Sequence, residues 1–181
     1  HKGSAFGAIN EPPQPTQQQF ENLLSIDIKK LCVAQHIFME DESFSIGRVK
    51  LPYPLWLQMK KAPIIKIVVP FEIRVQRLVE DYGNTDIETL RKPLLAIQRR
   101  LGGQHVKAAI EFLEKGELDK VAEIALNYYD EAYQFNHDKR ELKNIYEVHT
   151  TTGDGKINAA LIMDFLNSEK QIISSLHPNK I

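Results

Sequence analysis

The chain has 181 residues, of which 43% are hydrophobic and 26% charged, and its formal net charge at pH 7 is -1. This length suffices for one well-buried core, and the small net charge does not indicate a general polyanion-binding protein, although basic residues can still gather locally. The single cysteine, Cys32, excludes an internal disulfide and fits a reducing compartment. Because it lies in the apolar stretch LCVA, we expect it to be buried and not a nucleophile. No apolar run approaches the ~18 residues that span a bilayer, so we expect a cytoplasmic protein without membrane contact.

The N-terminal third predicts a loop, a helix and two strands. Residues 1–15 are rich in Gly and Pro, and Thr16 can cap a helix in which apolar residues recur at helical spacing. The apolar residues 37–39 predict a first strand. PIIKIVVP predicts a second, stronger strand, and its dense apolar content suggests burial on both faces, as in a parallel sheet. The segment LPYPLWLQMKKA between them predicts a short helix.

The remainder is expected to be mostly helical. A helix from residue 71 should end at Gly83, and Thr85 with Glu88 has the spacing of a capping box that opens the next helix. The pair Gly102-Gly103 should end that helix, and two further helices follow. IYEVHTTT predicts a third strand, and INAALIMDFLNSEKQIISSL predicts a last helix.

The order of these elements indicates an α/β layer structure with parallel strands and right-handed crossovers. Because three strands are few for so many helices, we expect further strands upstream of His1. An exposed sheet edge favours pairing with another chain, so a homodimer is a candidate state.

An acidic run follows the first predicted strand. In open α/β sheets, ligands bind outside the carboxyl ends of the strands. Glu40 and Glu42 fall at such an end, and carboxylates there could hold Mg²⁺ through water. The alternative is a solvated loop in which Ser43 caps a turn.

Arginines are the candidate phosphate ligands, because the planar guanidinium binds phosphate through two hydrogen bonds. Arg74 and Arg77 lie three residues apart and share one face of a predicted helix. Arg100 lies just before the Gly102-Gly103 pair. The alternative for Arg74 and Arg77 is ordinary surface pairing with nearby acids such as Glu72.

Three tyrosines lie near the end of a predicted helix, in LNYYDEAYQF. Tyr129 and Tyr133 are four residues apart on one helical face, and such rings could stack on bases or isoprenoid carbons. The alternative is that they pack between helices with their hydroxyl groups hydrogen-bonded.

Several other kinds of site are excluded. TTTGDGKIN resembles the centre of a calcium loop, but Thr150, Thr152 and Leu161 stand where carboxylate ligands are needed, so a polar turn is predicted. The six histidines show no zinc-ligand spacing. The chain contains neither G-x-S-x-G nor the phosphate loop G-x-x-x-x-G-K-[ST], which argues against a P-loop kinase.

Six motifs resemble bacterial tRNA 2-selenouridine synthase, and they occur in the order expected for its C-terminal part, over residues 1–135. They are HKGSAFG, QPTQQQFEN, MEDESFSIGRVKLP, RVQRLVEDY, RRLGG and NYYDEAY. The resemblance implies an enzyme with a rhodanese-like domain, which carries a catalytic cysteine, followed by a P-loop-containing domain. It also implies conversion of wobble 2-thiouridine in tRNA to 2-selenouridine through an S-geranylated intermediate, with geranyl diphosphate and selenophosphate as substrates.

The chain departs from this family pattern, because the rhodanese-like domain and the Walker-A segment are absent from it. We therefore expect an α/β fold in one domain, residues 1–181. It should hold a partial P-loop-like parallel sheet of about three strands and a large helical portion, inserted at about residues 71–140. This part should bind tRNA, a diphosphate substrate or both, with the missing rhodanese-like domain as a partner, and should be inactive alone. The alternative is a non-catalytic tRNA- or protein-interaction module.

The opening loop HKGSAFG suits phosphate binding. Gly3 and Gly7 would allow close backbone approach, and Lys2 would add a point charge. No catalytic residue is expected in this chain. The predicted substrate-binding residues are Lys2, Gly3, Ser4, Gly7, Arg74, Arg77, Arg100 and Tyr129.

Overall fold

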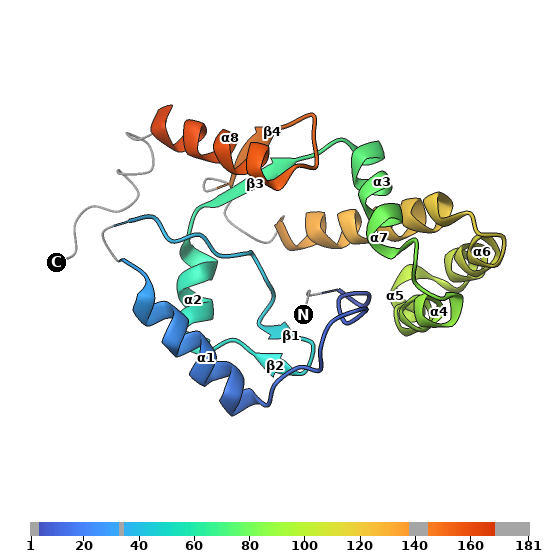
Figure 1. Cartoon of the computed structure of the whole chain (residues 1–181), viewed down its shortest axis with the longest axis horizontal. Coiled ribbons are helices and arrows are strands. Elements are labelled where there is room, and N and C mark those ends of the chain that lie inside the picture. The colour runs from blue at the N-terminus through green and yellow to red at the C-terminus, as the bar shows by residue number, and fades with distance from the viewer. Residues whose placement is uncertain (1–3, 33–34, 138–144, 169–181) are drawn as a thin grey trace. The chain divides into compact units, whose positions relative to one another are not determined.

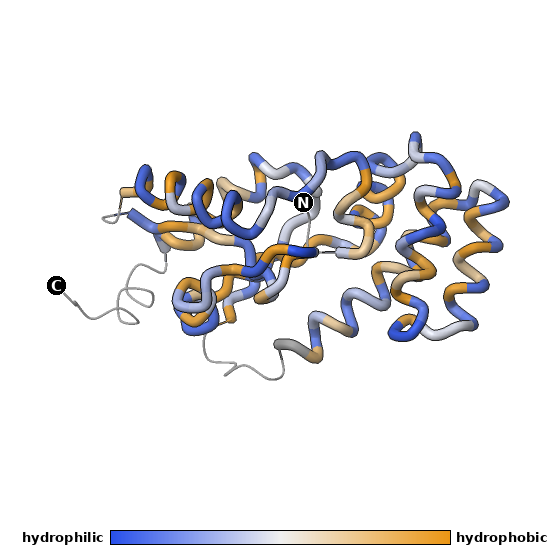
Figure 2. Tube along the Cα trace, turned by 90° about the horizontal axis from the view of Figure 1, so that it is seen from below, coloured by the Kyte–Doolittle hydropathy of each residue, from blue (hydrophilic) through white to orange (hydrophobic). Residues whose placement is uncertain are grey.

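The computed structural model (Figure 1) describes residues 4–32, 35–137 and 145–168. The chain forms two compact units that alternate along the sequence. The first unit holds residues 1–62 and 85–111, and the second holds residues 63–84 and 112–181. Hydrophilic and hydrophobic residues alternate along the helices (Figure 2), as expected for helices that bury one face.

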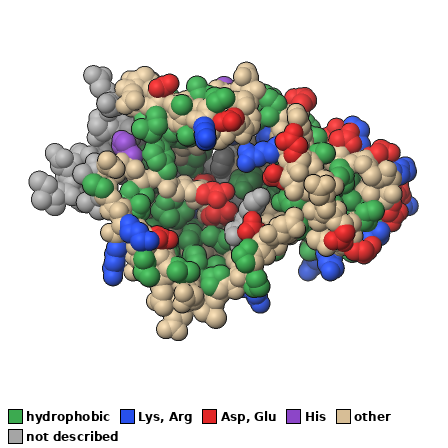
Figure 3. Space-filling model, in the orientation of Figure 1, with side chains coloured by type: hydrophobic (Ala, Val, Ile, Leu, Met, Phe, Trp, Pro, Cys, Tyr) green, Lys and Arg blue, Asp and Glu red, His purple; other side chains and the backbone are tan. Residues whose placement is uncertain are grey.

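The first unit begins with α1 (Gln17–Lys30), where the Thr16 hydroxyl accepts a hydrogen bond from the Gln19 N–H at 3.3 Å. The predicted helix and its cap are confirmed. None of the residues of α1 is buried; Leu23, Ile26 and Ile28 are exposed, and Phe20 and Leu24 are half-buried. Hydrophobic side chains are accordingly visible at the surface in Figure 3. Cys32 follows α1 and is also exposed, so its predicted burial is wrong.

A short antiparallel hairpin, β1 (Ser45–Ile46) and β2 (Val49–Lys50), follows in the same unit. The side chain of Gln14, which precedes α1, hydrogen-bonds the backbone on both sides of the hairpin turn. The Gln14 Nε2 donates to the Ile46 carbonyl at 2.7 Å, and its Oε1 accepts from the Arg48 N–H at 2.8 Å. The side-chain amide thus pairs as a backbone peptide does in a strand.

The side-chain amide of Gln17 also makes two hydrogen bonds to the hairpin, both to the backbone of Lys50. It donates to the Lys50 carbonyl at 2.9 Å and accepts from the Lys50 N–H at 2.8 Å. Strands of two residues are marginal alone, so these two glutamines help to explain why the hairpin forms. The next element, α2 (Tyr53–Lys61), confirms the predicted short helix.

The first unit also contains α4 (Ile87–Ala96), α5 (Gln98–Leu101) and the start of α6 (Gly103–Glu114). The N-cap of α4 is Asp86, whose Oδ1 accepts from the Thr89 N–H at 2.9 Å. The capping box predicted for Thr85 and Glu88 is therefore wrong, because the cap lies one residue later and Thr89 then takes the place of the glutamate. Gly102, with φ of 90°, separates α5 from α6, as predicted, but the single helix expected up to the glycine pair is interrupted at Ile97, between α4 and α5.

The second unit is built on a two-stranded parallel sheet, β3 (Ile64–Val68) and β4 (Ile145–His149). Both strands and their parallel pairing confirm the prediction, with Ile64 opposite Ile145 and Val68 opposite His149. The residues of β3 are all half-buried, so its predicted burial on both faces is wrong.

Besides the end of α6, three helices lie in the described part of the second unit. They are α3 (Phe71–Tyr82), α7 (Leu118–His137) and α8 (Gly155–Ser168). The helices α3 and α7 pack on each other, and α8 packs on β4, where the Phe165 ring lies 5.8 Å from the Tyr146 ring. The last predicted helix is confirmed as far as Ser168, and its remainder lies outside the described residues.

The loop between β4 and α8 is the predicted polar turn. The Asp154 Oδ1 accepts from the N–H groups of Lys156 and Ile157, at 2.8 and 3.0 Å, and so caps α8. The Asn158 side chain donates to the Thr152 carbonyl at 3.1 Å. The carboxylate in this loop therefore serves as a helix cap.

Each unit has its own apolar core. Leu94 and Leu113 are fully buried in the first and second units respectively. The first unit also buries Val49, Leu51, Leu90, Ile97, Leu101, Val106 and Ala109, and the second also buries Val75, Val121, Ala122, Ala125, Val148 and Leu166.

The first predicted strand is wrong. Described residues 35–43 form no strand, and Ile37, Phe38 and Met39 are between 44% and 56% exposed. Three apolar residues before an acidic run give no alternating pattern that could bury one face, and strand pairing instead begins at Ser45. The described strands thus form a hairpin and a two-stranded parallel sheet, so the mixed α/β class is confirmed and a P-loop-like sheet stays a prediction.

Candidate functional site

The predicted phosphate loop is described only in part, because Lys2 and Gly3 lie outside the described residues. Ser4 is half-buried and Gly7 is buried. The Gly7 N–H donates to the Ser4 carbonyl at 3.0 Å, so this amide already has a partner within the chain. Phosphate binding by this loop stays a prediction.

Glu40 and Glu42 lie in the irregular segment 35–43, where the Glu42 N–H donates to the Glu40 carbonyl at 2.8 Å. The strand end on which their predicted Mg²⁺ site depended is absent there. Within the described part of the chain, no group of three or more His, Cys, Asp or Glu side chains could hold a metal ion. Because Mg²⁺ prefers an octahedral set of oxygens, these residues do not by themselves fit a metal centre.

The guanidinium of Arg74 is held by an acid from another helix. Its Nη1 donates to Asp130 Oδ1 at 2.8 Å, and its Nη2 donates to Asp130 Oδ2 at 2.6 Å, a geometry that favours strong hydrogen bonds. The Arg74 Cζ lies 5.6 Å from the Phe71 ring centroid. The hydrogen bond to Asp130 raises the pKa of Arg74 above its ordinary value.

Arg77 and Tyr129 lie on the same two helices. Exposed Arg77 on α3 donates to the Gly153 carbonyl at 3.3 Å. Tyr129 on α7 is half-buried, and its ring lies 5.0 Å from the Tyr128 ring at 65°. The second unit therefore brings Arg74, Arg77 and Tyr129 onto α3 and α7, whereas Arg100 belongs to the first unit.

Arg99 and Arg100 lie side by side on α5, and both are exposed. With Ala96 and Ile97 they line a surface pocket of about 570 Å³. Neither arginine side chain has a hydrogen-bond or ion-pair partner among the described residues. The chain enters α6 directly afterwards, and the first N–H groups of a helix lack intrahelical partners and carry partial positive charge.

Basic residues gather in two segments of the first unit. Residues 43–62 and 89–110 contain no Asp or Glu, although the whole chain has 24 acids and 23 bases. We call these the acid-free segments. The first contains Arg48, Lys50, Lys60 and Lys61, and the second contains Arg91, Lys92, Arg99, Arg100 and Lys107. The near-zero net charge of the chain therefore conceals a local excess of positive charge, which can attract polyanions.

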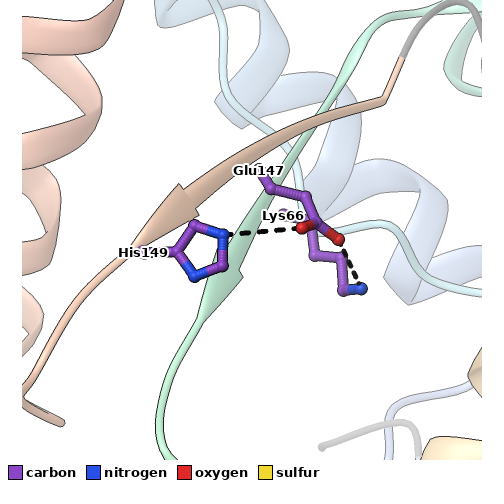
Figure 4. Close-up of polar contacts among 3 residues, drawn as sticks. All are labelled: Lys66, Glu147 and His149. Carbon is purple, nitrogen blue, oxygen red and sulfur yellow. Dashed lines mark hydrogen bonds and ion pairs between the residues drawn. The ribbon is translucent and has the colours of Figure 1, made fainter.

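A polar cluster on the parallel sheet was not predicted (Figure 4). The Glu147 carboxylate lies 2.9 Å from Lys66 Nζ on the paired strand and 3.6 Å from His149 Nε2. The hydrogen bond and charge of Lys66 lower the pKa of Glu147, and His149 contributes less. All three side chains are at least 40% exposed, and Lys66 and Glu147 occupy paired positions of the two strands. The sequence signal that could have predicted this cluster was the opposite charges of Lys66 and Glu147, each in the middle of a mainly apolar strand.

An aromatic cluster on the hairpin and α2 was also not predicted. The rings of Phe44, Tyr53 and Trp56 have centroids 5.5 to 6.2 Å apart, and Lys60 Nζ lies 5.8 Å from the Trp56 ring. The spacing of Tyr53, Trp56 and Lys60, three and four residues apart, was the signal that could have revealed it.

Within the described residues, no helix combines the length and apolar character needed to cross a membrane.

A family model described as "tRNA 2-selenouridine synthase AAA domain" matches residues 1–154. The chain therefore belongs to this family, and the resemblance noted in the sequence is confirmed.

Curated relatives named tRNA 2-selenouridine synthase come from several bacteria. The chain is 30% identical to that of Shewanella piezotolerans over 178 residues, 32% to that of Psychromonas ingrahamii over 173 and 32% to that of Bdellovibrio bacteriovorus over 185. These matches cover 81%, 77% and 83% of this chain and 48%, 46% and 48% of the relatives. The chain thus spans about half the length of the curated relatives it matches. No solved structure matches it.

Proposed function

We propose that this chain is the substrate-binding part of a tRNA 2-selenouridine synthase and that Arg99 and Arg100 hold phosphates of the tRNA. Membership of the family supports tRNA as the substrate. The observation that carries the proposal is a pocket lined by two adjacent arginines inside an acid-free segment.

The comparison with Arg74 supports this choice of residues. The fork of Arg74 is committed to Asp130 through two short hydrogen bonds. Arg99 and Arg100 face no such competition within the described residues, so they can offer their planar forks to a phosphate without first breaking an ion pair. Arg77, Tyr129 and the loop at Ser4 and Gly7 would act as further contacts.

In this proposal the complete enzyme replaces sulfur by selenium in wobble 2-thiouridine through a geranylated intermediate. Geranyl diphosphate and selenophosphate would be its substrates, and the pocket at Arg99 and Arg100 would also suit a diphosphate group. The chemistry at sulfur would need the cysteine of a rhodanese-like domain, so this chain alone should not turn over. A chain that converted thiolated tRNA unaided would contradict this part of the proposal.

The test measures tRNA binding by the 181-residue chain over a range of salt concentrations. Reversing both charges, Arg99→Glu with Arg100→Glu, should weaken binding more than tenfold and make the plot of log K against log salt shallower by about 1.5. The matched control reverses Lys29 and Lys30 at the exposed end of α1, which changes the net charge equally. Equal losses in the two variants would mean that only net charge matters, and would contradict the proposed pocket.

The alternative function is a non-catalytic interaction module. Its support is that the described residues contain no complete catalytic constellation. This module could interact with tRNA or with another protein. The same titration tests the protein-interaction form, because a module that does not handle tRNA should show neither measurable binding nor a salt dependence that responds to Arg99 and Arg100. Direct binding of inorganic pyrophosphate, measured by calorimetry, would then report whether the pocket takes a diphosphate instead.

A further inference from the structure

The three aromatic rings of the first acid-free segment form one cluster that reaches the surface at Tyr53. Tyr53 and Trp56 are three residues apart on α2, and their rings are tilted by only 30° with centroids 6.0 Å apart. The planes of the two rings are therefore close to parallel. Tyr53 is 58% exposed, whereas Trp56 and Phe44 are half-buried.

Phe44 braces this surface from the side. It meets the Tyr53 ring at 89° and the Trp56 ring at 62°, which are edge-on contacts. Edge-on contacts are favourable between aromatic rings and fix their orientation. Since Phe44 precedes the hairpin held by Gln14 and Gln17, the orientation of Tyr53 and Trp56 is set by structure outside α2.

One positive charge lies against the rings, and further basic residues lie close to them in sequence, although Glu40, Asp41 and Glu42 come shortly before Phe44. Lys60 Nζ lies 5.8 Å from the Trp56 ring centroid. The helix α2 contains no acid and ends in Lys60 and Lys61, and the hairpin contributes Arg48 and Lys50 from the same acid-free segment. A ligand that combines a flat aromatic group with a negative charge would match both features.

We propose that Phe44, Tyr53 and Trp56 form a stacking platform for an unpaired base of single-stranded RNA, with Lys60 beside the neighbouring phosphate. Stacking on aromatic side chains together with a basic surface is the general means by which proteins hold single-stranded nucleic acids. The platform rests on the proposed function, since it names how the tRNA substrate would be held, and it adds a site separate in sequence from Arg99 and Arg100.

Trp56 is the only tryptophan of the chain, so its fluorescence reports directly on the platform. A short single-stranded oligouridylate, or tRNA, should quench this fluorescence and reach saturation at the concentration at which anisotropy shows binding. Blunt double-stranded RNA keeps its bases stacked within the duplex, and we expect it to bind without quenching.

Substitutions at the exposed ring test the platform while Trp56 stays in place as the reporter. Tyr53→Ala should weaken binding of the oligouridylate about tenfold, within the range for loss of one base–aromatic stack, and Tyr53→Phe should retain it. Lys60→Gln should weaken binding more than its neighbour Lys61→Gln does, because only Lys60 lies over the ring.

Three outcomes would overturn the platform while the proposed function stands. RNA could bind with unchanged Trp56 fluorescence and with full affinity in Tyr53→Ala. Geranyl diphosphate could quench Trp56 where oligouridylate does not, which would identify an isoprenoid site. Quenching could instead follow protein concentration together with a rise in mass by sedimentation, which would identify an interface between two copies. If no RNA bound at all, the platform and the proposed function would both be wrong.

Discussion

Arg74 and Asp130 join α3 to α7 through two parallel hydrogen bonds of 2.8 and 2.6 Å. This pair lies in the second unit, where α3 and α7 form the main helix–helix contact. Sequence reasoning assigned Arg74 to phosphate or to acids on its own helix, such as Glu72. The actual partner is 56 residues away in sequence, which is why local spacing could not identify it.

Removing the charge of Asp130 should destabilise the second unit. We expect Asp130→Asn to lower the free energy of unfolding by about 1–2 kcal/mol, because the pair is stronger than a solvent-exposed one but is not fully buried. Urea denaturation measures the change. The control is Glu131→Gln, since Glu131 is the exposed neighbour on the same helix. Equal effects of the two substitutions would mean that the pair contributes nothing net.

Gln14 and Gly47 form a second coupled pair. Gly47 has φ of 59°, and a Cβ built there would lie 2.4 Å from Gln14 Oε1. That oxygen accepts a hydrogen bond from the Arg48 N–H, so it can move only if the hydrogen bonds between Gln14 and the hairpin break. Gly47→Ala should therefore strain the backbone and break the hydrogen bonds of Gln14. Together these changes should lower the free energy of unfolding by about 2–3 kcal/mol.

A double-mutant cycle separates these two terms. In a Gln14→Ala background the collision is gone, so Gly47→Ala should cost only about 1 kcal/mol, from the left-handed backbone conformation. Thermal unfolding of the four chains in the cycle provides the measurement. Additive effects would show that Gln14 does not hold the turn.

The sequence predicted the helices and the parallel strands well because their signals are local. The strand at residues 64–68 lies between prolines, and Gly102 marks a break between helices. The hairpin was missed because strands of two residues have no periodicity, and its support comes from Gln14 and Gln17, more than 30 residues away.

The candidate site shows the same division. The arginine pair at residues 99–100 could be read directly from RRLGG, whereas the aromatic platform depends on Phe44 reaching rings on a different element. The strand expected at residues 37–39 failed because apolar content was taken as burial, although those side chains are exposed. Local patterns predict elements, but they do not predict which side chains from distant segments meet.

Neighbouring leucines on α4 offer a direct test of the first core. Leu94 is fully buried, and Leu95 is 48% exposed. Leu94→Ala should lower the free energy of unfolding by about 3 kcal/mol, because it removes buried methyl groups and leaves a cavity. Leu95→Ala should change it by less than about 0.5 kcal/mol. Similar losses in urea denaturation would show that α4 does not bury the face described here.

The stability of the parallel sheet should depend on pH through the charge of Glu147. Lys66 lowers the pKa of Glu147 in the folded chain, so the charged carboxylate favours folding. This contribution is fully present above the unfolded pKa of roughly 4.3 and is lost as pH falls through the lower folded pKa. The melting temperature of the native chain should therefore exceed that of Glu147→Gln near neutral pH, and the difference should vanish in acid.

Two further variants identify the source of this pH dependence. In a chain that carries Lys66→Gln, the effect of Glu147→Gln on the melting temperature should be smaller, because Lys66 is the first cause of the lowered pKa. In a chain that carries His149→Gln, this effect should change little. The effect of Glu147→Gln should also shrink in high salt, since the three side chains are exposed and their interactions are screened. A difference in melting temperature that persisted unchanged at acid pH would contradict this prediction, because it would mean that Glu147 stabilises the sheet through packing and not through its charge.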